Sequence, residues 1–565
     1  MDVFCPSLTV PDALRRVLIA GGDGRLELEK AATLAESLSR ESAAPPGHAS
    51  AQNDLSRLAR NLRLAAFEAE PLDGRGAAAV LALDAERPFL DQPRRDLARA
   101  VAAMDVPPSD SRYLVRLLNR REHDKTLAYL ESRLAEEPDN LFWTRQLAGL
   151  SLACGDYAAA SRAASLLRRP PFAALVSLAD LIDADAAYLC QDYGAAERLW
   201  AACPLDAARA KRAEALVRLG RREEAVSLLR RDRAVRPWNV ATLLRLYDLE
   251  RDVDLATASL DGGLALLLYT FNKAQDLDRT LAELSRADLS FAPGARIVVL
   301  DNGSADATPD VLAAWADRLG PDIFERVDLP VNIGAPAARN WLLRHRAALE
   351  TAWIAYLDDD ADLPPDFIGR LAFATRAYPR AGAYGCRVVD FFNPPHIQSA
   401  DLFLEPIPPA PNAPLFSRAF ETSRSHLHSL DMGRFDYLRP CASVTGCCHL
   451  FAAGTLREVG DFDIRFSPSQ YDDLDHDLRG LLMDRIPVYQ GHLRVVHRKK
   501  TGSQGRPGGR HYAVGFANQF KLHNFHSGEE FAAMAHAAFE AALRDAGEKW
   551  TWLARRNGGQ TCLSE

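Results

Sequence analysis

Apolar residues recur at the spacing of an amphipathic helix from about residue 10 to residue 255. The segments LVRLGRREEAVSLLRR and LLRLYDLE show this pattern, and Ala, Leu, Arg and Glu are abundant around them. Stretches with the two-residue alternation of a β-strand are hard to find in this half. We therefore predict that the first half of the chain is α-helical.

Part of the helical half is repetitive. Three segments begin with a turn residue and place an alanine five positions later, at Gly155 and Ala160, Gln191 and Ala196, and Gly220 and Ala225. Such an alanine lets paired helices approach closely, and Pro237 would end the helix of the last unit. The spacing resembles the tetratricopeptide (TPR) repeat, although its aromatic and Leu-Gly positions are mostly absent. Generic helical hairpins are the alternative.

Near residue 255 the pattern changes to short apolar runs closed by polar turn residues. GLALLLYTF and ARIVVLDNGS read as strands, and DLDRTLAELSRA and TPDVLAAWADRL, which follow them, read as helices. Strands that alternate with helices predict an α/β domain with parallel strands. Ligands of such sheets bind beyond the carboxyl ends of the strands.

These patterns divide the chain into four parts. We predict a helical region of unassigned role at 1–105, TPR-like repeats at 106–255, an α/β domain at 260–525 and a helical extension at 526–565. Residues 390–440 lack clear periodicity and lie between the two halves of the α/β domain. We interpret them as an insertion on the acceptor side of a site.

Composition narrows the class of protein. The 565 residues suit two to four domains, and a net charge of −8 argues against wholesale binding of nucleic acid. The most apolar run, Leu264 to Tyr269, is far shorter than the ~20 residues that span a bilayer, so we expect no transmembrane segment. Nine scattered cysteines without a C-x-x-C pair fit a reducing cytosol. For Cys447 and Cys448 we favour small buried core residues, with reactive thiols as the alternative. We expect a cytoplasmic protein, and peripheral association with the inner face of the membrane stays open.

Three consecutive carboxylates, Asp358 to Asp360, follow a predicted strand. Like charges about 4 Å apart cost roughly 1 kcal/mol per pair even in water. A divalent cation would offset this cost, and carboxylate oxygens suit Mg²⁺ or Mn²⁺, which phosphate oxygens often complete. At the ligand edge of a sheet the pattern suggests a metal–diphosphate site, and a solvated turn is the alternative. Asp362 is predicted to cap a helix that begins near Pro364, and the charge of Asp366 is predicted to stabilise the first turn of that helix.

Other predicted strand ends also carry polar residues, and their order along the chain is informative. They are Thr270 and Asn272, then Asp301 to Ser304, then Asn332 to Asn340, then the acidic cluster. In this order the turns resemble those of the family 2 glycosyltransferases of the GT-A fold, over about residues 262–500. Tyr269 stands where the family usually has proline, and Pro336 lies within the glycine-containing turn. The resemblance implies a GT-A domain that takes a nucleotide-diphospho-sugar, typically a UDP-sugar.

The resemblance also implies roles for single residues. Asp301 would accept a hydrogen bond from the nucleotide base, and Thr270, Asn272 and Asn302 would line the same pocket. Arg339 would lie near the phosphates or the sugar. Asp358 would face the ribose or the metal, Asp359 would lie beside the nucleotide, and Asp360 would bind Mn²⁺ or Mg²⁺.

The segment after residue 440 resembles the second half of the same family. Thr445-Gly446, Val459 to Asp463, Asp472 to Arg479 and Val495 to His497 match its motifs, with Asp472 where glutamate is usual. The resemblance places the general base on Asp473 and lets His497 complete the metal shell. Single displacement at a sugar inverts the anomeric centre and needs a carboxylate within ~3 Å of the attacking hydroxyl. Favourable charge at a helix N-terminus is the alternative for these acids. Residues 498–510, basic and glycine-rich, are interpreted as a phosphate-facing lid or a solvated loop.

The sequence as a whole predicts an inverting, metal-dependent glycosyltransferase. The acceptor hydroxyl could belong to a glycan, a lipid-linked glycan or a protein, and the helical half could bind a protein partner on a concave surface. The alternative is a TPR-type scaffold with an inactive transferase domain. The sequence does not specify the sugar, the base, the acceptor, the oligomeric state or the role of residues 1–105.

Overall fold

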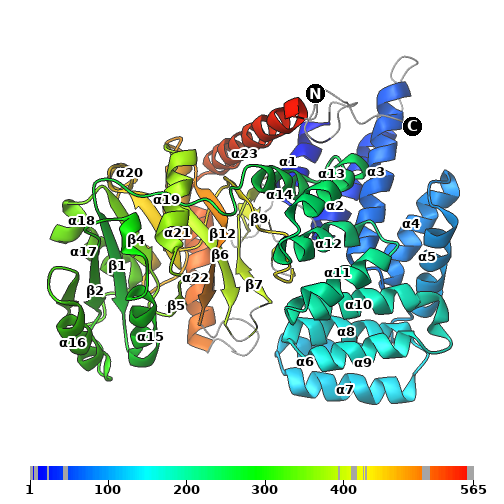
Figure 1. Ribbon diagram of the computed structural model, residues 1–565, viewed down its shortest axis with the longest axis horizontal. Coiled ribbons are helices and arrows are strands. Elements are labelled where there is room, and N and C mark those ends of the chain that lie inside the picture. Colours follow the sequence, from blue (N-terminus) through cyan, green and yellow to red (C-terminus); the bar gives the residue numbers. More distant parts are fainter. Residues whose placement is uncertain are drawn as a thin grey trace.

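The computed structural model has a helical half and a sheet-containing half that lie side by side (Figure 1). It describes Phe4 and residues 10–21, 24–41, 49–391, 393, 395–408, 417–423, 425–426, 429–498 and 509–556. Of the predicted lid, residues 499–508 lie outside the described residues, as does the end of the chain after residue 556.

The first half is helical, as predicted. Most consecutive helices pack against one another along the chain, and between Ala49 and Glu250 the structure contains helices and turns but no strand. The helices are α1 (Asp12–Ala20), α2 (Arg25–Glu41), α3 (Ala49–Ala69), α4 (Gly74–Glu86), α5 (Gln92–Met104), α6 (Arg112–Asn119), α7 (His123–Glu136), α8 (Leu141–Cys154), α9 (Tyr157–Leu167), α10 (Val176–Leu189), α11 (Tyr193–Ala202), α12 (Ala207–Arg218), α13 (Arg222–Val235) and α14 (Val240–Glu250).

The predicted turns of the repetitive segments are present. Gly155, Gln191 and Gly220 all have positive φ angles and stand at the ends of helices. The three alanines of the same segments, Ala160, Ala196 and Ala225, are fully buried, which is what close packing of paired helices requires. The TPR assignment itself stays a prediction.

The second half has the predicted α/β architecture. Apart from one separate pair of strands, it is built on one large sheet, which is mixed and not wholly parallel. Its strands follow the order β10-β12-β6-β11-β4-β1-β2-β3, in which β3, β2, β1 and β4 are parallel and β11 is antiparallel to both of its neighbours. This arrangement is typical of the GT-A fold. The strands are β1 (Leu264–Thr270), β2 (Arg296–Asp301), β3 (Phe324–Asp328), β4 (Trp353–Leu357), β5 (Ala361–Asp362), β6 (Tyr384–Asp390), β7 (Ile397–Ser399), β8 (Leu404–Pro406), β9 (Phe420–Thr422), β10 (Leu438–Pro440), β11 (Cys448–Ala452) and β12 (Val488–His497).

Both faces of the central strands are buried, which explains why they read as continuous apolar runs. In β1, Ala265 and Leu267 face one apolar cluster, whereas Leu264, Leu266 and Leu268 face the other. Helices pack on each face. They are α15 (Ala274–Leu284), α16 (Thr308–Leu319) and α19 (Phe367–Ala377) on one side, and α17 (Ala335–Leu343), α18 (Arg346–Leu349), α20 (Ala453–Val459) and α21 (Asp472–Leu481) on the other.

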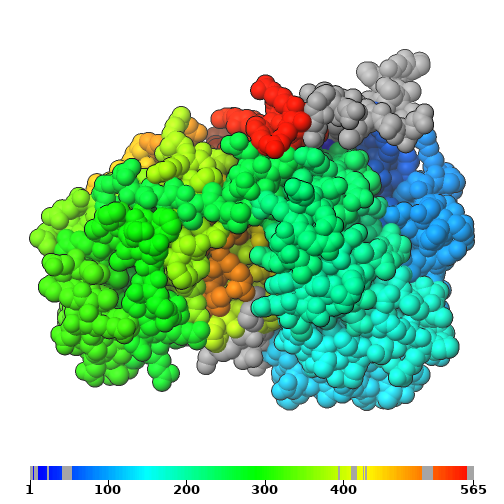
Figure 2. Space-filling model, viewed as in Figure 1, coloured from blue at the N-terminus to red at the C-terminus, as the bar shows by residue number. Residues whose placement is uncertain are grey.

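The two halves are packed together. α14 of the helical half contacts β10, and the last helix, α23 (Gly528–Arg556), contacts α14, α1, β8 and β10. α22 (Gly509–Phe525) precedes it. Figure 2 shows the halves in contact, with orange atoms, from the part of the chain that holds β12 and α22, between them.

One local prediction is wrong. Asp362 does not cap a helix but lies in β5, where its carboxylate pairs with Arg279 and Arg498, because β5 adds to β12 before the chain turns. α19 begins later, at Phe367, directly after Asp366. No helix among the described residues is long and apolar enough to cross a membrane.

Candidate active site

The turns after β1 and β2 lie side by side at the carboxyl edge of the sheet. The register pairs Thr270 with Asp301, and the N–H of Asn302 donates to the carbonyl of Thr270 over 2.9 Å. The N–H of Asn272 donates to Ser304 Oγ over 2.9 Å, and Asp301 Oδ1 accepts from the N–H of Ser304. The four residues predicted to line a nucleotide pocket therefore lie in two turns that are bonded to each other.

The glycine-containing turn after β3 joins this edge through Asn302. Its side chain donates to Asn332 Oδ1 over 3.1 Å and accepts from the N–H of Ile333 over 2.9 Å. Gly303 has a φ of 80°, and a β-carbon there would lie 2.8 Å from the backbone of Val331. This close approach requires glycine, so the Asp-Asn-Gly sequence positions the turns as well as lining them.

The acidic cluster follows β4 and meets a lysine from the turn after β1. Lys273 Nζ lies 2.9 Å from Asp359 Oδ1 and 2.7 Å from Asp360 Oδ2. Both carboxylates are buried, whereas Asp358 is only partly buried. The lysine therefore offsets part of the repulsion between neighbouring carboxylates.

The two buried carboxylates of the cluster have opposite protonation tendencies. Burial, with the charge of Asp360, raises the pKa of Asp359 to about 6 against the pull of Lys273. Burial also acts to raise the pKa of Asp360, but His497 and Lys273 outweigh it and hold this pKa well below its usual range. Asp360 is therefore the firmly ionised member of the pair.

His497, at the end of β12, reaches the acidic cluster because β12 pairs with β5 beside it. Its Nε2 atom lies 3.0 Å from Asp360 Oδ1 and 3.5 Å from Asp358 Oδ2. Cys447 directly precedes β11, and its carbonyl accepts the N–H of Asp358 over 3.0 Å. Asp358, Cys447 and His497 form a group whose ligand atoms all lie within 4.8 Å of one another.

Arg339, on α17, is buried between this cluster and α21. Its Nη1 atom donates to Asp472 Oδ2 over 2.6 Å. Its guanidinium carbon lies 5.5 Å from the ring centroid of Tyr269 and 5.2 Å from that of Phe462. Tyr269, the departure from the family's proline, thus supplies a ring that packs against the arginine.

Asp472 and Asp473 begin α21 and have different surroundings. Burial raises the pKa of Asp472 to about 6 in spite of its pairing with Arg339. For Asp473, burial is outweighed by the charges of Arg339 and His449 and by two backbone N–H donors, so its pKa is lowered. Asp473 Oδ2 accepts from the N–H of Gly446 over 2.8 Å. A β-carbon on Gly446 would lie under 3.0 Å from both Arg339 and Asp473, so only glycine fits between them.

Comparison with known families adds a decisive observation. The model of the family described as Glycosyl transferase family 2 matches residues 266–455. These residues belong to glycosyl transferase family 2. The matched part of this transferase domain contains the nucleotide-side turns, the acidic cluster, Arg339 and Cys447, whereas Asp473 and His497 lie beyond its end.

Known proteins resemble parts of this chain. Validoxylamine A glucosyltransferase of Streptomyces hygroscopicus subsp. jinggangensis (strain 5008) is 32% identical over 105 residues, which are 19% of this chain and 24% of the relative. The chain therefore spans about a quarter of that relative's length. GalNAc-T7 with UDP, GalNAc and Mn²⁺ covers 46% of this chain and 47% of its own at 11% identity and a TM-score of 0.35. The mannosyltransferase PcManGT of Pyrobaculum calidifontis, in complex with GDP-Man and Mn²⁺, covers 56% and 87% at 17% identity and a TM-score of 0.33.

The structure brings the sequence-predicted residues of the transferase domain to one edge of the sheet. Their roles stay predictions, and sequence reasoning missed three neighbours. Lys273 directly follows Asn272 in the first turn, which was a usable signal. Cys447 was interpreted as a core residue in preference to a reactive thiol. It is buried, but it lies beside Asp358 and His497. Gln398, on β7, lies in the segment interpreted as an acceptor-side insertion, and its Oε1 is 3.0 Å from His497 Nδ1.

Proposed function

We propose that this chain is an inverting, metal-dependent glycosyltransferase that moves a sugar from a nucleotide-diphospho-sugar to an acceptor hydroxyl. One observation carries the proposal. Within a family 2 domain, the acidic cluster after β4, the buried Arg339 and the ionised Asp473 are gathered at the carboxyl edge of the sheet.

On the donor side, the turns after β1 and β2 supply the nucleotide pocket. Asp301 and Asn302 carry the acceptors and donors that a base and a ribose need, and we propose a UDP-sugar as the donor. Asp358, Asp360 and His497 would hold Mn²⁺ or Mg²⁺, and this ion would offset the charge of the diphosphate leaving group. Arg339 adds a permanent positive charge to the same side of the site.

On the acceptor side, Asp473 is the group that takes the proton. Because its pKa is lowered, its carboxylate is ionised at neutral pH and can accept a proton from an attacking hydroxyl. The N–H of Gly446 holds the Asp473 carboxylate in place, and Arg339, which pairs with the neighbouring Asp472, adds positive charge beside it. The acceptor belongs to a glycan, a lipid-linked glycan or a protein, and the helical half is the proposed binding surface for that acceptor or for a protein partner.

Lys273 favours a second candidate, a scaffold with an inactive transferase domain. Its ammonium group already supplies a positive charge to Asp359 and Asp360, which an ion would otherwise supply. Calorimetry with UDP and Mn²⁺ separates the two candidates. Binding of UDP that depends on Mn²⁺ supports the transferase, and absence of binding supports the scaffold.

The transferase is tested by donor turnover with UDP-, GDP- and dTDP-sugars, with and without Mn²⁺. Asp473→Asn should lower turnover of the best donor by about 10²–10⁴-fold, because an amide cannot take the proton. Nucleotide affinity should stay within a few fold of the wild type. Asp484→Asn, at an exposed ion pair with Arg380, is the control and should leave turnover unchanged. Normal turnover by Asp473→Asn would remove Asp473 from the mechanism.

A further inference from the structure

The candidate metal site contains a sulfur atom, from Cys447, beside the oxygen and nitrogen ligands that the sequence predicts. Its side chain is 2% exposed, and its Sγ lies with a carboxylate oxygen of Asp358 and a ring nitrogen of His497 within one 4.8 Å group. Atoms that share one ion at bond lengths of 2.0–2.3 Å lie at most about 4.6 Å apart. Movements of a few tenths of an ångström would therefore let one cation contact all three.

The position of the thiol is determined by the sheet. β11 runs antiparallel to β4, with Cys448 opposite Leu357, and one step further the N–H of Asp358 donates to the carbonyl of Cys447. The residue that precedes β11 is thus held directly across from the first residue of the acidic cluster. Cys448, its neighbour, lies inside β11 and is not part of the group.

His497 is oriented to present Nε2 to the same point. Gln398 Nε2 faces the carboxylate of Asp390 at 3.3 Å, so its Oε1 atom faces His497 Nδ1 at 3.0 Å. A carbonyl oxygen only accepts, so Nδ1 donates to Gln398. The ring then directs Nε2 at Asp360 and Asp358, toward the place where an ion held by these carboxylates would lie. Outer hydrogen bonds of this kind orient the histidine ligands of metal sites.

We propose that Cys447 is a thiolate ligand of a divalent cation bound with Asp358 and His497. Thiolate and imidazole ligands favour zinc-class ions, whereas Mg²⁺ prefers an all-oxygen shell. A Cys-His-Asp set with one position left open is the arrangement of a reactive zinc-class site. The thiolate would therefore shift the preference of the proposed donor site away from Mg²⁺ and toward Zn²⁺ or Co²⁺, and the thiol proton passes to solvent when the ion binds.

This inference concerns the ion at the proposed donor site, and its role in sugar transfer rests on the proposed function. Ion binding is measured without any sugar. We suggest a titration of the full chain with Co²⁺, because a cobalt–thiolate bond gives a strong charge-transfer absorption in the near ultraviolet. Cys154 Sγ lies 3.1 Å from His123 Nδ1, and Cys190 is exposed, so both are changed to serine in the background protein.

In this background we expect the absorption to appear as Co²⁺ binds. Cys447→Ala should abolish the absorption and weaken Co²⁺ binding by about tenfold or more. Cys448→Ala, which removes the neighbouring sulfur, is the matched control and should keep the absorption. Binding of Co²⁺ without the absorption, or an unchanged absorption in Cys447→Ala, would overturn the proposal.

A second measurement needs no variant at position 447. X-ray absorption of the Zn²⁺-loaded background protein should show one sulfur at about 2.3 Å, and a shell of nitrogen and oxygen alone would contradict a thiolate ligand. The two proposals fail separately. Donor turnover supported by Mg²⁺ without a metal–sulfur signal would reject the thiolate ligand and support the transferase. A metal–sulfur signal without turnover of any donor would support the thiolate ligand and reject the transferase.

Discussion

Lys273 determines the charge of the acidic cluster. Its Nζ atom contacts one oxygen of Asp359 and one of Asp360, and burial of the carboxylates makes these contacts stronger than surface ion pairs. The lysine side chain itself is 38% exposed, so solvent screens it in part. Lys273 can therefore compensate the charge of the acidic cluster in the absence of an ion, and a bound ion could displace its ammonium group.

Replacing this lysine should make the protein depend on a divalent cation. Lys273→Met removes the charge and keeps most of the apolar stem, which leaves two adjacent buried carboxylates without their partner. We expect a loss of about 1–3 kcal/mol in the free energy of unfolding with a chelator present. Saturating Mn²⁺ or Zn²⁺ should restore more stability to the variant than to the wild type, as measured by thermal melts.

Arg279→Met is the matched control for this experiment. It removes a half-exposed cation that pairs with Asp362, outside the acidic cluster. Its stability should change by less than about 1 kcal/mol, and the change should not respond to metal. If Lys273→Met melted like the wild type with and without metal, the lysine would not be compensating these carboxylates.

The start of α21 is held by a buried carboxyl group one turn beyond Asp473. Asp477 Oδ2 accepts from Ser443 Oγ over 2.8 Å and from the N–H of Val444 over 3.0 Å. Burial raises the pKa of Asp477 to about 8, against the effect of these two donors. Asp477 thus fixes the segment that leads to Gly446, and it does so as a neutral acid near pH 7.

This carboxyl group predicts a defined dependence of stability on pH. An aspartate of the unfolded chain releases its proton near pH 3.9, whereas folded Asp477 keeps it to about pH 8. Between these values the folded state holds the extra proton, so stability should fall as the pH rises through this window. Asp477→Asn keeps an acceptor without a titration, and near pH 7 it should exceed the wild type by on the order of 1–3 kcal/mol.

Urea denaturation at the two ends of the window measures this difference. The stability advantage of Asp477→Asn should vanish near the acidic end of the window, where Asp477 is protonated in both the folded and the unfolded wild type. Asp461→Asn, at an exposed pair with Arg344, is the control and should show the slope of the wild type. An advantage of the same size at both ends would mean that the amide packs better, and that ionisation of Asp477 is not the cause.

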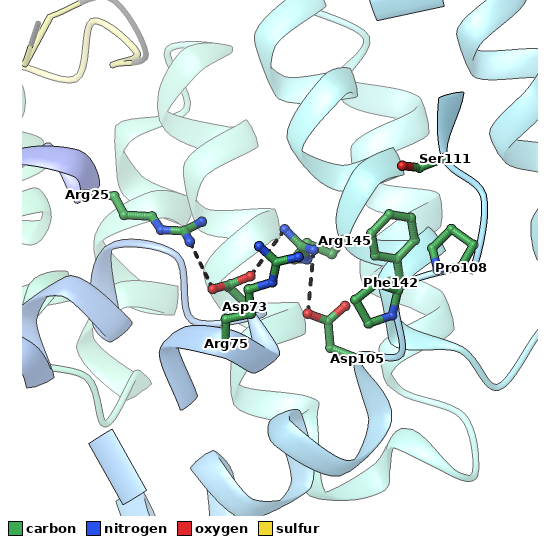
Figure 3. A pocket seen from close by; sticks show the side chains of 9 residues that line it. Arg25, Asp73, Arg75, Asp105, Pro108, Ser111, Phe142 and Arg145 are labelled. Atoms are coloured by element: carbon green, nitrogen blue, oxygen red, sulfur yellow. Dashed lines mark hydrogen bonds and ion pairs between the residues drawn. The ribbon is translucent and has the colours of Figure 1, made fainter. Parts of the chain in front are cut away.

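The helical half has its own buried charge cluster, at the start of α4. Figure 3 shows Arg25 and Arg145 turned toward Asp73, and Arg145 also toward Asp105, around a cavity of about 250 Å³. Asp73 Oδ2 accepts from the N–H of Gly76 and from Arg25 Nη2 over 3.0 Å, and Asp73 Oδ1 lies 3.6 Å from Arg145 Nη1. One carboxylate therefore caps α4 and joins it to α2 and α8.

Removing this carboxylate should cost more than removing an ordinary cap. Asp73→Ala loses the cap and also the carboxylate that Arg25 and Arg145 share, although Arg25 keeps Glu29 and Arg145 keeps Asp105. We therefore expect a loss of about 2 kcal/mol. Asp91→Ala is the matched control, because Asp91 caps α5 through the N–H of Arg94 but is half exposed, and it should lose about 1 kcal/mol. Thermal melts that gave equal losses would show that Asp73 acts only as a cap.

Elements were easier to predict than their contacts. The apolar runs of β1 and β2 and the turn at Gly155 are signalled locally, so the sequence indicated them. The pairing of Lys273 with Asp360, or of Cys447 with Asp358, depends on strands that are distant in sequence and adjacent in the sheet. No local pattern encodes that adjacency. Asp362 was mistaken for a cap for the same reason, because β5 exists only through its pairing with β12.

At the scale of the whole molecule, the helical and transferase halves share buried polar contacts. Asp248, on α14, is fully buried, and its Oδ2 accepts from the N–H of Leu438 and from His492 Nε2, each over 2.8 Å. On the same helix, Arg245 pairs with Glu214 and donates to the carbonyl of Asp436 over 3.4 Å. One apolar cluster also contains residues from both halves. These contacts predict that the halves unfold together.

Differential scanning calorimetry of the full chain should therefore show one transition. Asp248→Ala leaves the buried N–H of Leu438 and the ring of His492 without their acceptor, and each such group costs about 1–3 kcal/mol. We expect the variant to lose about 2–4 kcal/mol, with the transition lowered as a whole. We suggest two single-tryptophan proteins, one that keeps only Trp143, deep in the helical half, and one that keeps only Trp353, on β4. Their fluorescence should report the same unfolding midpoint.

Asp261→Ala is the control, because Asp261 is exposed and its contribution to the fold is a backbone carbonyl that accepts from Trp353 Nε1. It should melt like the wild type. Two separate transitions, or a fall of only the Trp353 midpoint in Asp248→Ala, would mean that the helical half is an independent domain docked on the transferase. A shared midpoint that falls for both tryptophans would mean that the helical half is part of the folding unit that holds the candidate site. In that case the buried carboxylate of Asp248 on α14 supports the pair of strands β10 and β12, and His497 is the last residue of β12.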